Sequence, residues 1–238
     1  MTEHTAKAFD VDLQSLARMV AEMGGLAEKE IADAVDALVK NDTTLAQRVM
    51  TSDLVTDTLQ REIEEKTILT IARRQPMAVD LREIIAAMRI SNDLERIGDF
   101  AKNIAKRVVA LNGDFPPAKL IRGVEHMADL VLGQVKQVLD AYARRDVPQA
   151  MEVWRGDEEI DAVNNSLFRE LLTYMMEDPR NITFCTHLLF CAKNIERMGD
   201  HATNIAETVY YIAEGRPLVD ERPKGDTTSS TTVPFPAA

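Results

Sequence analysis

The sequence predicts an all-α protein built from two copies of a three-helix unit. The chain of 238 residues is 45% apolar but only 5% aromatic, and residues that favour helices, such as Ala, Leu, Met and Glu, are common. Apolar residues recur at spacings of three and four, as on the buried face of a helix. A segment of the form Glu-Arg-x-Gly-Asp occurs twice, 101 positions apart. We therefore expect two tandem three-helix bundles related by internal duplication.

The first half of the chain, residues 1–112, contains three predicted helices. Suitable N-cap residues at 41–44 separate the first helix from the second. Pro76 fits the first turn of the third helix, and Gly113 follows its end. These signals predict helices over about residues 11–40, 41–74 and 76–111.

The second half, residues 113–215, repeats this plan after a linker at 112–117 that contains Gly and two Pro residues. Its helices are expected at about residues 118–145, 146–177 and 178–215. Residues 216–238 contain a run of Thr and Ser and little apolar periodicity, so we expect a flexible tail there.

The composition limits the class of protein. With 39 acidic and 28 basic residues the formal charge is -11, which argues against nucleic acid as the main partner. The chain starts without a secretory signal pattern and has no apolar run of about 18 to 20 residues, so a cytoplasmic protein is expected. Cys185 and Cys191 match neither a redox nor a zinc motif, and we expect buried free thiols.

Two repeated patterns of carboxylates are the candidate functional feature. Each copy of the repeated segment places Glu, Asp and Asn at i, i+4 and i+8, along one stripe of a helix. These residues are Glu95, Asp99 and Asn103 in the first half and Glu196, Asp200 and Asn204 in the second. A second repeat, 104 positions apart, consists of Asp53 and Asp57 in the second helix and Asp157 and Asp161 in the fifth.

The hairpin arms have nearly equal lengths, so the carboxylates of each half should face one another. Asp57 lies 18 residues before Gln75, and Glu95 lies 20 residues after it. At a rise of about 1.5 Å per residue this difference is only about 3 Å. Four facing carboxylates repel one another unless they are protonated or bridged by cations. Cation binding is the favoured interpretation, and a solvated acidic face with salt bridges is the alternative.

Glycines and ligand types refine this interpretation. Gly98 and Gly199 lie between the expected ligands, at a cost of about 1 kcal/mol each within a helix. They indicate either tight helix packing or room for a ligand. Oxygen ligands suit Mg, Mn or Fe better than a structural zinc site. His201 is a further candidate nitrogen ligand, although its counterpart is Phe100.

Catalytic motifs do not appear in either half. The sequence shows no Ser-His-Asp or Cys-His pairing, no phosphate-binding glycine loop and no Glu-x-x-His pair of the di-iron type. We therefore expect a protein that is not an enzyme. A metal-dependent phosphohydrolase and a purely structural helical scaffold are the alternatives.

The doubled Glu-Arg-Ile/Met-Gly-Asp-x-Ala-x-Asn-Ile segment, the upstream Asp-x-x-x-Asp pairs and the stretch Ala78-Val79-Asp80-Leu81-Arg82 closely resemble the PhoU family. The resemblance covers residues from about 10 to 213. It implies two three-helix bundles that hold metal ions, often iron or zinc clusters, on their surfaces. The implied ligands are the ten carboxylate and Asn residues of the two repeated patterns.

The resemblance also implies a role and partners. PhoU-like proteins restrain phosphate-starvation signalling by linking the phosphate ABC transporter to a membrane sensor histidine kinase, so this chain would act peripherally at the inner face of the membrane. Asn181 and Thr183 replace Asp80 and Arg82 in the second half, which departs from the family pattern. A homodimer is expected if cation sites are shared between chains.

Overall fold

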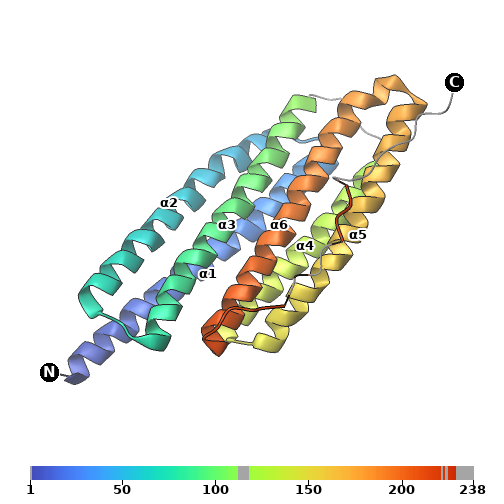
Figure 1. The fold of residues 1–238 in the computed structure, drawn as a ribbon. Coiled ribbons are helices and arrows are strands. Elements are labelled where there is room, and N and C mark those ends of the chain that lie inside the picture. Colours follow the sequence, from blue (N-terminus) through green and yellow to red (C-terminus); the bar gives the residue numbers. More distant parts are fainter. Residues whose placement is uncertain (1, 112–117, 221, 223–224, 229–238) are drawn as a thin grey trace.

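The computed structural model describes residues 2–111, 118–220, 222 and 225–228, which form six α-helices and one 3-10 turn (Figure 1). The first half contains α1 (Thr2–Lys40), α2 (Thr43–Arg74) and α3 (Ala78–Leu111). The second half contains α4 (Ala118–Arg144), α5 (Val147–Glu177), the turn η1 (Pro179–Asn181) and α6 (Ile182–Glu214). The predicted all-α fold with two three-helix units is confirmed. The predicted linker at 112–117 lies outside the described residues.

Equivalent aspartates begin the second helix of each half. The Asp42 carboxylate accepts hydrogen bonds from the backbone N–H groups of Thr44 and Leu45, both at 2.9 Å. Asp146 lies 104 positions later and accepts one bond of 3.1 Å from the N–H of Gln149. A carboxylate at this position satisfies N–H groups that have no partner inside the helix. The same capping chemistry therefore starts α2 and α5.

The hairpin turns of the two halves differ in length. In the first half residues 75–77 connect α2 to α3, whereas α5 passes through Asp178 directly into η1. Asp178 accepts a hydrogen bond of 2.9 Å from the N–H of Arg180 and so caps the 3-10 turn. The sixth helix consequently begins at Ile182, later than the sequence predicts. The shift from a 104- to a 101-residue repeat falls at this turn, as expected.

The two three-helix units pack into one body. Helices α3 and α6 lie side by side at its centre, and α1 and α4 also contact each other (Figure 1). One apolar core contains residues of both halves, such as Ile97 of α3 and Ile195 of α6. Among the described elements, α2 contacts α1 and α3, and α5 contacts α4, α6 and η1. Helices α2 and α5 therefore lie at opposite sides of the body, whereas α3 and α6, which carry the repeated Glu-Arg-x-Gly-Asp segments, lie side by side between them.

Candidate functional site

The second and third helices of each half carry one cluster of carboxylates. We call Asp53, Asp57, Glu95 and Asp99, on α2 and α3, the first cluster, and Asp157, Asp161, Glu196 and Asp200, on α5 and α6, the second cluster. Burial, then Asp99, and also the α2 aspartates raise the pKa of Glu95 above its usual value. Burial raises the pKa of Asp157, and so do the charges of Asp161 and Asp200, whereas Arg222 acts to lower it. Carboxylates of the two helices of each hairpin are thus close enough to influence one another's charge, and their joint service as metal ligands remains a prediction.

Several of these carboxylates are buried, which distinguishes the clusters from a solvated acidic face. Asp53, Asp157, Asp161 and Glu196 are between 1% and 6% exposed. A buried carboxylate is costly unless it is protonated, paired with a cation or hydrogen-bonded. Each cluster therefore requires a compensating group.

A fifth carboxylate, Glu30 of α1, joins the first cluster and was not identified from the sequence. It is 3% exposed, and its carboxylate accepts a hydrogen bond of 2.9 Å from the Thr56 hydroxyl. Burial, and to a smaller extent the charges of Asp53 and Asp57, raise the pKa of Glu30 to about 7. Near neutral pH Glu30 is thus divided between its protonated and ionised forms. Gln134 stands 104 positions later, at the equivalent place in the second half. This pairing of two polar residues of similar size was the signal in the sequence that could have identified Glu30.

The repeated glycines make room for groups from neighbouring helices. A Cβ atom on Gly98 would lie 2.7 Å from Oε2 of Glu30. A Cβ atom on Gly199 would lie 3.0 Å from the Cδ1 methyl of Ile160 and 3.6 Å from Oδ1 of Asp157. Of the two alternatives that the sequence left open, close packing by the chain's own side chains is thus present at both sites, and in the first half the packed group is itself a carboxylate.

Lys102 supplies positive charge to the first cluster. Its ammonium donates a hydrogen bond to Asp53 and lies 3.8 Å from Asp99. Oδ1 of Asp53 and Oε2 of Glu30 are nevertheless buried without a hydrogen-bond partner among the residues that the structure describes. Two orphaned buried carboxylate oxygens, on an all-oxygen donor set, fit a hard cation or a proton. Within the described residues, however, no group of three or more His, Cys, Asp or Glu side chains is arranged so that it could hold a metal ion.

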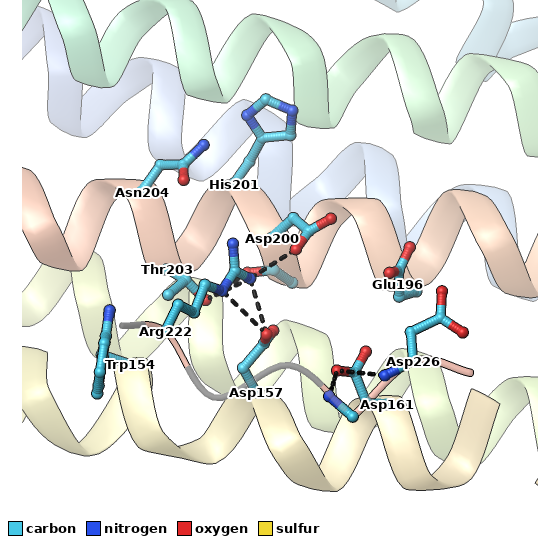
Figure 2. Close-up of polar contacts among 12 residues, drawn as sticks. Trp154, Asp157, Asp161, Glu196, Asp200, His201, Thr203, Asn204, Arg222 and Asp226 are labelled. Atoms are coloured by element: carbon cyan, nitrogen blue, oxygen red, sulfur yellow. Dashed lines mark hydrogen bonds and ion pairs between the residues drawn. The ribbon is translucent and has the colours of Figure 1, made fainter. Parts of the chain in front are cut away.

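The second cluster receives positive charge from the C-terminal segment and from Lys193 of α6. The Arg222 guanidinium donates two hydrogen bonds, of 2.8 and 3.1 Å, to Oδ2 of Asp157, and lies 2.6 Å from Oδ1 of Asp200 (Figure 2). It also donates to the hydroxyl of Thr203 at 3.1 Å. Lys193 lies 2.8 Å from Glu196 and 2.7 Å from Asp226. The expectation of a flexible tail gave no reason to look for these contacts.

The hydrogen bonds of the predicted ligands Asn103, Asn204 and His201 are made to residues outside the two clusters. Asn204 donates a hydrogen bond of 3.3 Å to Asp93 of α3, and Nδ1 of His201 lies 2.8 Å from the same carboxylate. Figure 2 shows both side chains on the face of α6 opposite Asp157. The Asn103 amide oxygen accepts a bond of 3.3 Å from Lys106. The structure thus pairs Asn204 and His201 with a carboxylate outside the clusters, and the participation of all three side chains in a metal site remains a prediction.

Three other expected residues also have defined surroundings. Cys185 and Cys191 are buried free thiols, as predicted, and burial raises the pKa of Cys191 to about 12. The Arg82 guanidinium lies 3.3 Å from where a Cβ atom of Gly215 would stand. The first-half Asp-Leu-Arg element therefore contacts the end of the last helix. The apolar side chains of Met77 and Val79 beside it are 80% and 46% exposed.

The fold and the site together define a class of protein: a duplicated helical bundle with one buried carboxylate cluster in each half. A family model described as "PhoU domain" matches residues 20–108 and 124–209. The chain belongs to the PhoU family. The family consists of accessory and regulatory proteins and is not an enzyme family, which confirms the expectation that this chain is not an enzyme.

Individual relatives agree with this membership. The chain is 61% identical over 227 residues to a "Phosphate-specific transport system accessory protein PhoU homolog" of Rhizobium meliloti, covering 95% of this chain and 96% of that protein. A Caulobacter vibrioides homolog of the same description is 53% identical over 96% of this chain and 100% of the relative.

Solved structures show the same fold. The crystal structure of PhoU from Pseudomonas aeruginosa matches with a TM-score of 0.83 and 40% identity, covering 87% of this chain and 100% of that one. The phosphate transport system regulatory protein PhoU from Streptococcus pneumoniae matches with a TM-score of 0.82 and 28% identity, over 88% and 99% of the two chains.

No helix in the described part of the chain combines the length and apolar content that crossing a bilayer requires.

Proposed function

We propose that this protein is a cytoplasmic accessory regulator of phosphate-specific transport that restrains phosphate-starvation signalling when phosphate is plentiful. Its similarity to accessory proteins of that transport system, across nearly its whole length, is the observation that carries the proposal. The protein would link the ATPase component of the phosphate ABC transporter to a sensor histidine kinase. It would act peripherally at the inner face of the membrane through these partners, as a homodimer.

We further propose that the carboxylate clusters bind metal ions such as iron, zinc, manganese or magnesium. The unpartnered buried oxygens of Glu30 and Asp53 support such binding at the first cluster. There Asp53, Asp57, Glu95 and Asp99 would hold the ion, and Lys102 would turn away from it. A bound cation would supply positive charge that offsets repulsion among the carboxylates and so stabilise the hairpins that carry them.

A complementation experiment tests the regulatory proposal. A strain that lacks this protein is supplied with the wild-type chain or with a fourfold variant, and a phosphate-dependent transcriptional reporter is measured in phosphate-rich medium. The variant changes the Glu and Asp of both repeated segments to Ala: Glu95, Asp99, Glu196 and Asp200. We expect it to lose repression, because the charge pattern that binds cations is removed, and to carry less metal by elemental analysis.

The matched control changes four exposed glutamates outside the clusters to Ala: Glu22, Glu64, Glu125 and Glu158. It should repress like the wild type. Unchanged repression and unchanged metal content in the cluster variant would sink the metal-dependent part of the proposal. Loss of repression in both variants would point instead to net charge. Light scattering on the purified protein tests the homodimer.

A further inference from the structure

The second cluster is occupied by a segment of this chain. Helix α6 ends at Gly215, whose φ of 70° is in the left-handed region that glycine tolerates, and the chain then returns along α5. Residues 222 and 225–227 contact α5 from Asp157 to Asn165, a span of about 12 Å at 1.5 Å per residue. Figure 2 shows the contacts with Asp157 and Asp161. The contacts follow the acidic stripe of α5 over two turns.

Arg222 bridges the two helices that carry the second cluster. Its side chain is 14% exposed, and its bonds reach Asp157 on α5 and both Asp200 and Thr203 on α6. Paired hydrogen bonds between a guanidinium and a carboxylate are stronger and more specific than single neutral bonds. The guanidinium therefore engages the carboxylate oxygens that a metal ion would need.

Backbone groups after Arg222 extend this recognition. The N–H groups of Gly225 and Asp226 donate bonds of 2.6 and 3.0 Å to Oδ2 of Asp161. The Asn165 amide donates a bond of 2.7 Å to the Gly225 carbonyl and accepts one of 3.0 Å from the N–H of Thr227. A Cβ atom at Gly225 would lie 3.3 Å from Cβ of Asp161, so the missing side chain permits the close approach. The segment is thus held both by its arginine and by its main chain.

The two clusters differ at the position of Lys102. Lys102 of α3 is bonded to Asp53, whereas the residue 101 positions later is Thr203, which is fully buried and neutral. In the second cluster Arg222, which lies outside the duplicated units, pairs with Asp157 and Asp200, whereas Lys193 of α6 pairs with Glu196. The counter-charge of Asp53 therefore belongs to a helix, whereas that of Asp157 and Asp200 belongs to a terminal segment.

We propose that the second cluster is a peptide-binding site whose ligand is formed by residues 222 and 225–227 of this chain's own C-terminal segment, and that this segment and a metal ion exclude each other there. The first cluster is then the site at which a metal ion binds without competition from the segment. The competition rests on the metal binding proposed above, whereas docking of the segment does not.

Hydrogen exchange on the metal-free protein tests the docking. In the presence of a chelator the amides of Gly225 and Asp226 should exchange slowly, because both are bonded to Asp161. Arg222→Ala should accelerate their exchange about tenfold or more. The matched control Arg216→Ala replaces an exposed arginine just after α6 and should leave the exchange unchanged. Equal exchange of these amides in the wild type and Arg222→Ala would overturn the docking.

Titration with Mn²⁺ then tests the competition. Added Mn²⁺ should accelerate exchange at Gly225 and Asp226 in the wild type, since binding releases the segment. By calorimetry, Arg222→Ala and a chain that ends at Gly215 should bind Mn²⁺ at the second cluster about tenfold more tightly than the wild type, because apparent affinity is reduced by the fraction of closed sites. Arg216→Ala should match the wild type.

The outcomes separate the two proposals. Mn²⁺ binding at both clusters with equal affinity in the wild type and Arg222→Ala would overturn the competition alone. If no variant binds Mn²⁺, the competition falls together with the proposed metal binding. Segment docking would still be decided by the exchange of the Gly225 and Asp226 amides without metal.

Discussion

The first and second clusters share four carboxylate positions but differ in the groups that surround them. The first cluster contains Glu30 of α1 and is paired with Lys102 of α3. At the corresponding positions the second half carries Gln134 and Thr203, and Asp157 is paired with Arg222 of the C-terminal segment. Duplicated ligand positions therefore do not make duplicated sites.

The difference has an electrostatic consequence. The first half adds an ionisable group to a cluster that is already acidic, and burial of Glu30 raises its pKa to about 7. Gln134 is of similar size and cannot ionise. Near neutral pH the first cluster thus contains a carboxyl group that can exchange a proton, at a position where the second cluster has an uncharged amide.

Replacing Glu30 by the residue of the second half should have the largest effect. The pKa of Glu30 is raised from 4.5 to about 7, so the folded state favours its protonated form. This contribution to stability is fully present below pH 4.5 and is lost as the pH rises through 7. Glu30→Gln should therefore change the free energy of unfolding little at pH 4.5 and raise it by about 3 kcal/mol at pH 8.

Urea unfolding with a chelator present, at both pH values, measures this change. Glu22→Gln, at an exposed site on the same helix, is the matched control and should have no effect. If Glu30→Gln raises the free energy of unfolding equally at both pH values, the ionised carboxylate is not the source of the instability. Adding Mn²⁺ should narrow the difference, because the cation stabilises the ionised form of wild-type Glu30.

Removing the helix-borne cation should have the next largest effect. Lys102→Met keeps most of the apolar stem but leaves the buried Asp53 carboxylate without its ion pair. Because the Lys102 side chain is 27% exposed, we expect a loss of about 2 kcal/mol in the free energy of unfolding, less than for a fully buried pair. Chemical denaturation with a chelator present measures the loss.

Lys106→Met, one helical turn further along α3, is the control for Lys102→Met. Lys106 is exposed and bonds only weakly to the Asn103 amide at 3.3 Å. Lys106→Met should therefore change the free energy of unfolding by less than about 0.5 kcal/mol. Similar losses in the two variants would contradict a specific role of Lys102 at Asp53. If Mn²⁺ restores part of the stability that Lys102→Met loses, the lysine and the metal ion neutralise the same carboxylates.

The helix caps should give the smallest difference between the halves. Asp42 accepts two backbone hydrogen bonds and Asp146 one, so Asp42→Ala should cost about 1 kcal/mol and Asp146→Ala about half of that. Thermal unfolding followed by circular dichroism measures both, with Asp10→Ala within α1 as a control. A larger loss for Asp146→Ala would mean that hydrogen-bond number does not decide the strength of these caps.

Much of the fold could be predicted because its signals are local. Apolar spacing, the aspartate caps and the prolines predict all six helices, and the equal hairpin arms predict that Asp53 and Asp57 face Glu95 and Asp99. The amide ligands show the limit of such reasoning. Each four-residue step turns about 40° beyond a full helical revolution. By the second step Asn204 therefore faces Asp93 of α3 and not the carboxylates.

By itself, the sequence determined the duplicated all-α architecture and the four carboxylates of each cluster, because these depend on helix periodicity and on distances along a hairpin. Only the tertiary structure decided what compensates them. Glu30 comes from a separate helix and Arg222 from a segment beyond the last one, so their positions depend on the packing of α1 and on the return of the chain along α5. Long-range contacts of this kind leave no periodic signal, and here they make two similar acidic stripes into two different sites.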